Sequence, residues 1–313
     1  MGSSGFIGRL TGVGLDDIAS LTLTKKVEIK PDMLFKTLLV GLLDRPGGRA
    51  ILGLLATFYA RYSTGADFEI TYRDIWIHRV NGCYFPGGHK FNYNRYTIAQ
   101  SIRFENHCCS NSNELWFPFY HPSEGDIIVD VGAGRGEDVP GFLKAIGRTG
   151  KLIAIEAHPH SFKELEQFCK LNQFQNITLL QMAAMDKPGY VTLTDVNNWE
   201  ANAINQVAEA GGIEVKAETL DNICTALGVE EISFLKINIE GAERFALLGM
   251  DRIIFRCKAV CVACHDFRAN KGDDEQFRTR AFVEQYLRER GFKVMSRQLD
   301  PRDYVRDHIF GLK

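Results

Sequence analysis

Short apolar runs alternate with amphipathic segments through the second half of the chain. The apolar runs lie at 127–131, 151–157, 177–183 and 258–266. Between them, hydrophobic residues recur at helical spacing, as in 161–172, where Ser161 can cap the first turn. Buried strands that alternate with helices predict a doubly wound, mostly parallel sheet with helices on both faces. Two further runs, 292–297 and 308–313, predict a closing pair of strands.

The first part of the chain has a different pattern. Residues 1 to about 65 are predicted to be helical, and 33–60 contains two apolar runs of about ten residues each. Each run is about half as long as a helix that crosses a bilayer, so the pair predicts core helices or, alternatively, a surface that touches a membrane. From 68 to 80 apolar and polar residues alternate, and Asn81-Gly82 then supplies a tight turn. These signals predict a small antiparallel β layer within 67–120.

Composition sets limits on partners and compartment. The 313 residues are 45% hydrophobic and carry a net charge of −2, which gives no indication of a nucleic-acid partner. The eight cysteines follow no paired framework, and no secretory signal is visible. We therefore expect a cytoplasmic protein, in which 1–120 forms a helical region with a small β layer and 121–313 forms the α/β domain. The sequence leaves the oligomeric state open.

A glycine-rich turn follows the first strand of the α/β domain. In VDVGAGRGE, Gly132, Gly134 and Gly136 have the spacing G-x-G-x-G, with Ala133 between the first two. The dinucleotide fingerprint needs a glycine where this chain has Glu137. Acidic side chains at the start of the next helix would also repel a diphosphate. The turn therefore predicts a closely approached ligand without phosphate, and a purely structural turn is the alternative.

A carboxylate at the end of the second strand extends this pattern. Glu156 follows Gly136 by about twenty residues, the position at which an acidic side chain accepts ribose hydroxyls in nucleotide-binding α/β folds. A nucleoside with a positive charge and no phosphate is S-adenosylmethionine, which we predict as the cofactor. Asp130 is assigned to its amino-acid end, and Ala157 and Ala184 complete the predicted contacts.

The segment 235–243, LKINIEGAE, places polar residues in alternation. If it forms a strand, Lys236, Asn238 and Glu240 share one face. An unpaired buried polar group costs about 1–3 kcal/mol, and an unpaired charge costs more. We therefore predict that Asn238 and Glu240 reach the ligands and that Lys236 lies deeper and is paired. Alternatively, Lys236 and Glu240 pair with each other or with neighbouring charges for structural reasons.

Four stretches of the α/β domain occur in a recognisable order, namely DIIVDVGAGRGE, IAIEAHP, ETLDNI and LKINIEGAE. Together, over about 120–266, they resemble the FkbM-type family, a branch of the class I S-adenosylmethionine-dependent methyltransferases. The resemblance implies a Rossmann-like, seven-stranded sheet with an antiparallel last strand. It also implies O-methylation of a hydroxyl on a sugar, glycolipid or other secondary metabolite. One residue departs from the family pattern, because Asn238 stands where an Asp is expected, which weakens a role of that position as base or metal ligand.

Methyl transfer to a hydroxyl requires alignment of two groups and removal of a proton. The predicted catalytic residues are His265, Glu240, Asn238 and Lys236. His265, which ends the strand after LKINIEGAE, is the leading candidate base because its ordinary pKa lies near neutrality. Glu240 is the alternative base, or it orients His265. Glu240, His265 and Asp266 are also compatible with a divalent metal ion, an alternative that stays open.

Two other functions remain open at this stage. A nicotinamide-dependent oxidoreductase would use the same fold, although Glu137 and the lack of a visible Tyr-x-x-x-Lys pair count against it. A non-catalytic cofactor-binding module is suggested by Asn238 alone. For the enzyme we expect a small-molecule or glycan acceptor with a free hydroxyl, no nucleic acid, and acceptor selection by 1–120. The segment 195–205 would form a pocket wall, on which Trp199 could stack a sugar ring.

Overall fold

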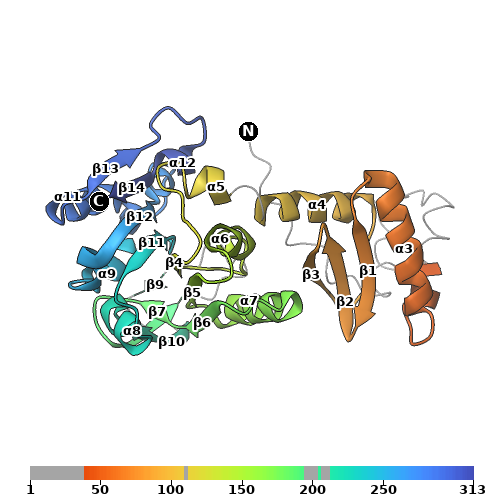
Figure 1. Cartoon of the computed structure of the whole chain (residues 1–313). Coiled ribbons are helices and arrows are strands. Elements are labelled where there is room, and N and C mark those ends of the chain that lie inside the picture. The colour runs from red at the N-terminus through yellow and green to blue at the C-terminus, as the bar shows by residue number, and fades with distance from the viewer. Residues whose placement is uncertain (1–38, 109–111, 194–203, 206–211) are drawn as a thin grey trace.

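The computed structural model describes residues 39–108, 112–193, 204–205 and 212–313. These residues form two lobes (Figure 1). The C-terminal lobe contains a seven-stranded sheet and a four-stranded sheet, and the N-terminal lobe contains a three-stranded sheet. The structure thus has both the predicted α/β architecture and the predicted small β layer.

The seven-stranded sheet follows the order β13-β14-β12-β11-β4-β5-β6. Neighbouring strands from β12 to β6 are parallel, whereas β14 runs antiparallel to both β12 and β13. This arrangement confirms the predicted Rossmann-like sheet with an antiparallel last strand. The direction of winding reverses between β4 and β11, where open α/β sheets bind ligands. The strands are β4 (Ile127–Val131), β5 (Lys151–Glu156), β6 (Ile177–Gln181), β11 (Ile232–Ile237), β12 (Cys257–Ala263), β13 (Lys293–Ser296) and β14 (His308–Leu312).

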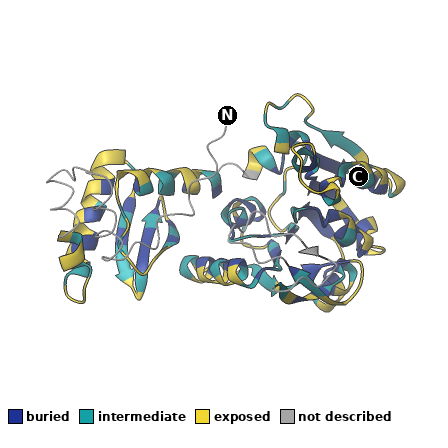
Figure 2. Cartoon of the chain, turned by 180° about the vertical axis from the view of Figure 1, so that it is seen from behind, coloured by how far each residue is buried: buried dark blue, intermediate teal, exposed yellow. Residues whose placement is uncertain are grey.

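Successive residues of the central strands face opposite sides of this sheet. Ile128 and Phe234 pack with residues of α6 and α7, whereas Val129 and Leu235 pack with residues of α8, α9 and α11. Helices therefore cover both faces, and the strands between them are buried (Figure 2). The helices of this lobe are α5 (Ser112–Leu115), α6 (Val139–Ile146), α7 (Pro159–Asn172), α8 (Leu220–Ala226), α9 (Glu243–Leu248), α10 (Asp266–Ala269), α11 (Arg280–Glu289) and α12 (Asp303–Arg306), with 3-10 turns η3 (Ile253–Arg256) and η4 (Glu275–Phe277).

A second sheet of this lobe follows the order β7-β10-β8-β9. Its central strands, β8 and β10, pair antiparallel. Residues 194–203, including Trp199 of the predicted pocket wall, lie outside the described residues. The strands are β7 (Ala183–Ala184), β8 (Gly189–Leu193), β9 (Ile204–Asn205) and β10 (Ile213–Glu218).

The N-terminal lobe differs in one respect from the predicted pattern. The alternating run 68–80 forms two antiparallel strands, because the chain turns back at Asp74, which has a φ of 64°. Asp tolerates this left-handed conformation better than most residues, so a turn forms without glycine. The second turn lies at Asn81-Gly82, as predicted. The elements are α3 (Arg49–Thr64), β1 (Phe68–Arg73), β2 (Ile75–Val80), β3 (Cys83–Gly88) and α4 (Arg95–Asn106).

The two lobes meet where α7 lies against β3. The Asn172 side chain accepts a hydrogen bond from the Tyr84 backbone N–H and donates one to the Tyr84 carbonyl, both at 2.8 Å. Phe85 stacks on Phe168 with ring centroids 5.4 Å apart. This contact fixes the N-terminal lobe to a helix that begins beside the ligand-binding edge of the main sheet.

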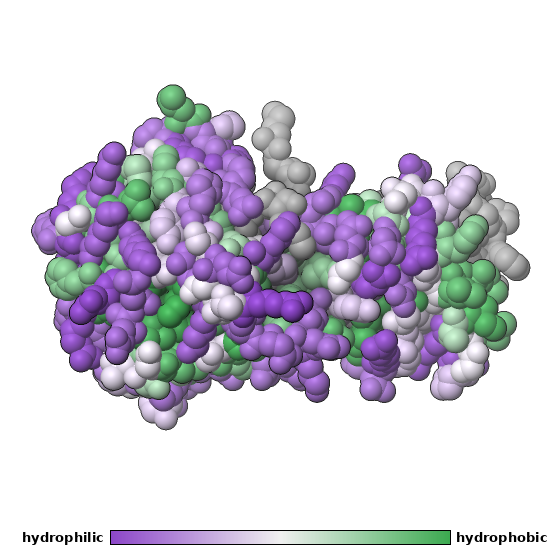
Figure 3. All heavy atoms as spheres, in the orientation of Figure 1, coloured by the Kyte–Doolittle hydropathy of each residue, from purple (hydrophilic) through white to green (hydrophobic). Residues whose placement is uncertain are grey.

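Helix α3 buries one face and exposes another. Leu52, Ala56 and Ala60 are buried in the core, and the helix packs on β1. The outward face is apolar, and Figure 3 shows hydrophobic side chains gathered at this end of the molecule. In the described residues, no helix is long and apolar enough to cross a membrane. The exposed apolar side chains of α3 are Ile51, Leu54, Leu55, Phe58, Tyr59 and Tyr62.

Candidate active site

A crevice with a volume of about 880 Å³ lies at the carboxyl ends of β4, β5, β11 and β12. Its inner half is bordered by the glycine-rich turn and by Glu156, and its outer half by residues of α10 and α12. Ala133, Ala157 and Ala184, which the sequence proposed as cofactor contacts, line the inner half. Small side chains at these positions leave room for a flat ligand against the backbone.

The glycine-rich turn is held against both neighbouring strands. Gly132 has a φ of 79°, and a Cβ atom there would lie 2.0 Å from the carbonyl oxygen of Asn238. Gly134 has a φ of 57°, and its N–H donates to Glu156 Oε2 at 2.9 Å. Side chains at these positions would therefore be strained or displaced, so the turn needs glycine for its own packing as well as for any ligand.

Glu156 is oriented by two backbone donors. Gly134 N–H donates to one carboxylate oxygen, and His158 N–H donates to the other at 2.8 Å. Burial raises the pKa of Glu156, and these two donors act in the opposite direction. Each oxygen keeps a lone pair for a further donor. The carboxylate is thus fixed at the crevice wall with capacity for two ligand hydroxyls.

Two predicted cofactor contacts, Asp130 and Gly136, lie behind the crevice wall. The Asp130 side chain is fully buried, with its Oδ1 atom 2.7 Å from Lys236 Nζ. A Cβ atom on Gly136 would lie 2.9 Å from Leu165 and Phe168, so this glycine serves the packing of the turn on α7. The spacing of the motif could not separate these supporting positions from the ligand-facing ones.

Lys236 supports the turn from below. Its Nζ atom lies 2.7 Å from Asp130 and 3.6 Å from Asp138, and it donates to the Gly132 carbonyl at 2.8 Å. Burial alone would lower the pKa of Lys236, but the two carboxylates outweigh that effect and raise it. The residue is therefore deep and paired, as predicted, but its partners are these aspartates and not Glu240. A reactive role for Lys236 does not follow from this arrangement.

Two acidic side chains follow the glycine-rich turn. In the sequence they indicated only that a diphosphate would be repelled. Glu137 and Asp138 both line the crevice. Glu137 Oε2 accepts from Arg135 N–H, and burial raises its pKa to about 7. Asp138 accepts from the Trp116 indole N–H at 2.7 Å. The inner half of the crevice is thus rich in carboxylates, which favours a cationic ligand.

The polar segment after β11 is a turn and not a continued strand. β11 ends at Ile237, and Asn238 N–H donates to the Val131 carbonyl at 2.9 Å. Glu240 follows with a φ of 51°, and Gly241 with a φ of 95°. The predicted alternation therefore ends at the strand terminus. Asn238 and Glu240 still reach the crevice, but through a left-handed turn.

His265 is enclosed by two carboxylates. Its Nε2 atom lies 3.1 Å from Glu240 Oε1, and its Nδ1 atom lies 2.8 Å from Glu243 Oε1. Arg268 donates to the other oxygen of Glu240 at 2.6 Å. Burial on its own lowers the pKa of His265, but the two carboxylates outweigh it and raise the value to about 10. At neutral pH the ring is therefore an imidazolium ion, and this geometry favours Glu240 over His265 as the proton acceptor.

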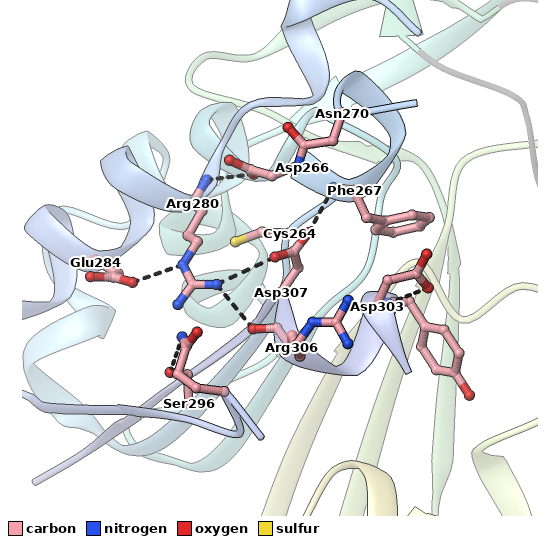
Figure 4. A network of polar contacts seen from close by, with 12 residues as sticks. Cys264, Asp266, Phe267, Asn270, Arg280, Glu284, Ser296, Asp303, Arg306 and Asp307 are labelled. Atoms are coloured by element: carbon pink, nitrogen blue, oxygen red, sulfur yellow. Dashed lines mark hydrogen bonds and ion pairs between the residues drawn. The ribbon is translucent and has the colours of Figure 1, made fainter. Parts of the chain in front are cut away.

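Asp266 is directed away from this cluster. Its Oδ2 atom accepts from the backbone N–H groups of Thr279 and Arg280, both at 3.0 Å, at the start of α11 (Figure 4). Glu240, His265 and Asp266 therefore do not converge, and the described residues contain no group of three side chains suited to a metal ion. His265 and Asp266 are adjacent in the sequence and were therefore considered as ligands of one metal ion. The turn after β12 directs their side chains apart.

The outer half of the crevice was not anticipated from the sequence. Phe267 and Lys271, from α10 and the turn after it, lie at its border with Asp303 and Tyr304 of α12. Lys271 and Asp303 form an ion pair that joins the two segments. Pairing of β12 with β14 brings these distant segments together, and no local motif marks them.

The fold and the acidic, glycine-bordered crevice define a class I methyltransferase architecture. Residues 130–294, more than half of the chain, match the family profile described as the methyltransferase FkbM domain, and the chain belongs to that family. The resemblance found in the sequence is thereby confirmed.

Two curated relatives have different acceptors. The chain is 20% identical over 163 residues to the 2-O-methyltransferase NoeI of Sinorhizobium fredii, a match that covers 47% of this chain and 66% of that protein. It is 27% identical over 108 residues to a tRNA (cytosine(72)-C(5))-methyltransferase of Pyrococcus horikoshii, which covers 34% of this chain and 22% of that protein. The chain thus spans less than two thirds of the length of either relative.

Two solved structures are similar to part of this chain. The methyltransferase FkbM from Methylobacillus flagellatus has a TM-score of 0.47 at 16% identity, over 70% of this chain and 55% of that one. Fibrillarin from Aeropyrum pernix, in complex with natively bound S-adenosyl-L-methionine, has a TM-score of 0.36 at 15% identity, over 62% of this chain and 68% of that one.

Proposed function

We propose that the protein is an S-adenosylmethionine-dependent O-methyltransferase that acts on a hydroxyl group of a sugar, glycolipid or other secondary metabolite. The observation that carries the proposal is the Glu156 carboxylate, fixed by the Gly134 and His158 N–H groups beside the glycine-rich turn. A carboxylate in this position suits the two hydroxyls of a ribose. Family membership adds independent support.

The charge of the inner crevice fits this cofactor. Glu137, Asp138 and Glu156 line it, and Lys236 is occupied by its own buried partners. A sulfonium with an ammonium group is attracted to such a surface, whereas the diphosphate of a dinucleotide is repelled. Repulsion of the diphosphate also disfavours a nicotinamide-dependent oxidoreductase.

The residues that would hold the cofactor come from the inner half of the crevice. Glu156 would bind the ribose of the cofactor, and the turn from Gly132 to Gly134 would face its amino-acid part. Ala157 and Ala184 would flank its adenine ring. When bound, S-adenosylmethionine supplies an electrophilic methyl group.

The protein's own part in the reaction is to place and deprotonate the acceptor. Glu240 faces the crevice from the turn after β11, with one oxygen near His265 and the other near Arg268. The Glu240 carboxylate would accept the proton that the acceptor hydroxyl gives up when it is methylated. Phe267 and Tyr304, at the outer border, offer flat apolar surfaces for an acceptor ring. The 2-O-methyltransferase relative supports oxygen as the acceptor atom.

Incubation with methyl-labelled S-adenosylmethionine tests the proposal. The acceptors are a panel of free sugars, a glycolipid extract and bulk tRNA. We expect label in a hydroxyl-bearing product, with a large loss in Glu240→Gln and none in Glu166→Gln, a matched change at an exposed position of α7. Label in tRNA alone, or in nothing, contradicts the proposal.

A further inference from the structure

Glu243 is a buried carboxylate that the function proposed above does not use directly. It is the first residue of α9, its side chain is 0% exposed, and it lies behind the crevice wall. Its Oε1 atom accepts from Gly241 N–H at 3.1 Å and lies 2.8 Å from His265 Nδ1. Its Oε2 atom has no hydrogen-bond partner among the described residues.

A carboxylate in this environment needs a compensating charge. Burial of an ionised carboxyl group is strongly unfavourable unless a cation lies close to it. The nearby cation is His265, since both of its ring nitrogens lie within hydrogen-bond distance of a carboxylate oxygen and both must then carry a proton. The elevated pKa of His265 agrees with this assignment.

The contacts from Glu243 through His265 lead to Glu240, which reaches the crevice. Glu240 is the member of the cluster that borders the cavity together with His265, and its side chain is 24% exposed. Its two oxygens are held by different donors, His265 and Arg268. Its backbone is left-handed, a conformation that a non-glycine residue adopts only when its surroundings impose it. Glu240 is therefore fixed in both position and plane.

We propose that Glu243 is a positioning residue for methyl transfer, which acts through His265 to hold the Glu240 carboxylate toward the acceptor hydroxyl. The inference rests on the function proposed above. A purely structural ion pair is a weaker account, because a buried pair seldom stabilises a fold more than apolar residues of the same size. The hydrogen bond from Gly241 N–H does not explain the charge of Glu243 either, because a neutral side chain could accept it.

Glu243→Gln is the informative variant. Glutamine keeps the size of the side chain, and its Oε1 can still accept from Gly241 and His265, but the negative charge is lost. A general base contributes about 10²–10⁴ to the rate, so loss of its positioning should lower kcat by roughly tenfold to hundredfold. The Kd for S-adenosylhomocysteine should stay close to the wild-type value. The melting temperature should fall less than in a variant that leaves a buried charge alone, because His265 keeps Glu240 as its partner. Glu105→Gln, at a buried glutamate of the N-terminal lobe that accepts from Asn81, is the matched control and should leave kcat unchanged.

A second measurement does not depend on turnover. In protein labelled with ¹⁵N-histidine, the His265 ring should show two protonated nitrogens at neutral pH. In Glu243→Gln the ring should lose its second proton at a lower pH than in the wild-type protein, because one of the two carboxylate charges beside it is gone. A singly protonated ring in the wild-type protein, or a Glu243→Gln kcat within twofold of wild type, overturns the positioning role. Parallel losses of kcat, cofactor affinity and melting temperature would also overturn it, in favour of a structural role. Wild-type protein that transfers methyl to no acceptor while the ring carries two protons would instead contradict the proposed function, and the role of Glu243 in it.

Discussion

The ion pair beneath the glycine-rich turn gives a quantitative prediction. Lys236 and Asp130 are 2% and 0% exposed, with 2.7 Å between Nζ and Oδ1. Lys236→Met removes the cation, keeps most of the volume and leaves Asp130 buried without it. Removal of one partner of a buried pair costs about 3–5 kcal/mol. For a domain of roughly 200 residues, such as 121–313, about 2–4 °C of melting temperature corresponds to each kcal/mol, so the variant should melt roughly 6–20 °C below wild type at pH 8.

The pH dependence of this deficit separates the charge effect from a packing effect. Burial raises the pKa of Asp130 to about 6 even though Lys236 opposes the shift. Without Lys236 the pKa must rise further, so the carboxyl group takes up a proton at a higher pH than in wild type. A group with a raised folded-state pKa stabilises the fold below its unfolded value and loses that contribution as pH rises through the folded value. The melting deficit should therefore shrink between pH 8 and pH 5.

Differential scanning calorimetry of three proteins is the assay. Lys236→Met combined with Asp130→Asn removes both charges and should recover much of the lost stability at pH 8, because the fully buried carboxylate of Asp130 is then gone as well. A deficit of the same size at pH 8 and pH 5, or a double variant no more stable than Lys236→Met, would refute the reasoning.

Three further predictions concern the cofactor, a metal ion and the surface of the N-terminal lobe. Glu156→Gln should weaken S-adenosylhomocysteine binding about tenfold to hundredfold in calorimetry, since hydrogen bonds to charged groups contribute about 1.5–3 kcal/mol each; unchanged affinity would remove Glu156 from the site. Methyl transfer should be insensitive to a chelator, because the Asp266 carboxylate is bonded to the start of α11; activity that is lost with EDTA and restored by a divalent cation would contradict this. Phe58→Glu together with Leu54→Glu, on the exposed face of α3, should reduce co-flotation with lipid vesicles if that face contacts membranes. Flotation of the wild-type protein no greater than that of the variant would contradict the alternative interpretation of 33–60 as a surface that touches a membrane.

The sheet was predictable from the sequence because buried parallel strands are continuous apolar runs. The runs 127–131 and 151–157 correspond to β4 and β5 within one residue. The turns between strands were harder to predict. Asp74 turns the chain in a left-handed conformation without any glycine signal, so one alternating run became two strands.

The candidate site was predictable only where it follows directly from the strand order. Glu156, Glu240 and His265 each lie at or just after a strand end, and the structure brings them to one crevice. Glu243 belongs to the same quoted motif, but the expected strand assigned no role to a residue beyond Glu240. The turn at Glu240 and the start of α9 place Glu243 beneath His265, a consequence of backbone geometry that residue spacing does not reveal.

The outer border of the crevice shows the limit of inference from sequence. Phe267 and Tyr304 are brought to one edge because Ala263 pairs with His308 across antiparallel strands. A contact between segments so distant in the chain depends on strand register. Neither segment has a local pattern that predicts a site.

The central claim is that the crevice accepts the S-adenosyl nucleoside of a methyl donor and rejects a dinucleotide. Titration calorimetry of the wild-type protein with S-adenosylhomocysteine and, separately, with NAD tests it most directly. The account predicts saturable binding of S-adenosylhomocysteine in the micromolar range and no measurable heat with NAD. Binding of NAD without binding of S-adenosylhomocysteine would contradict it.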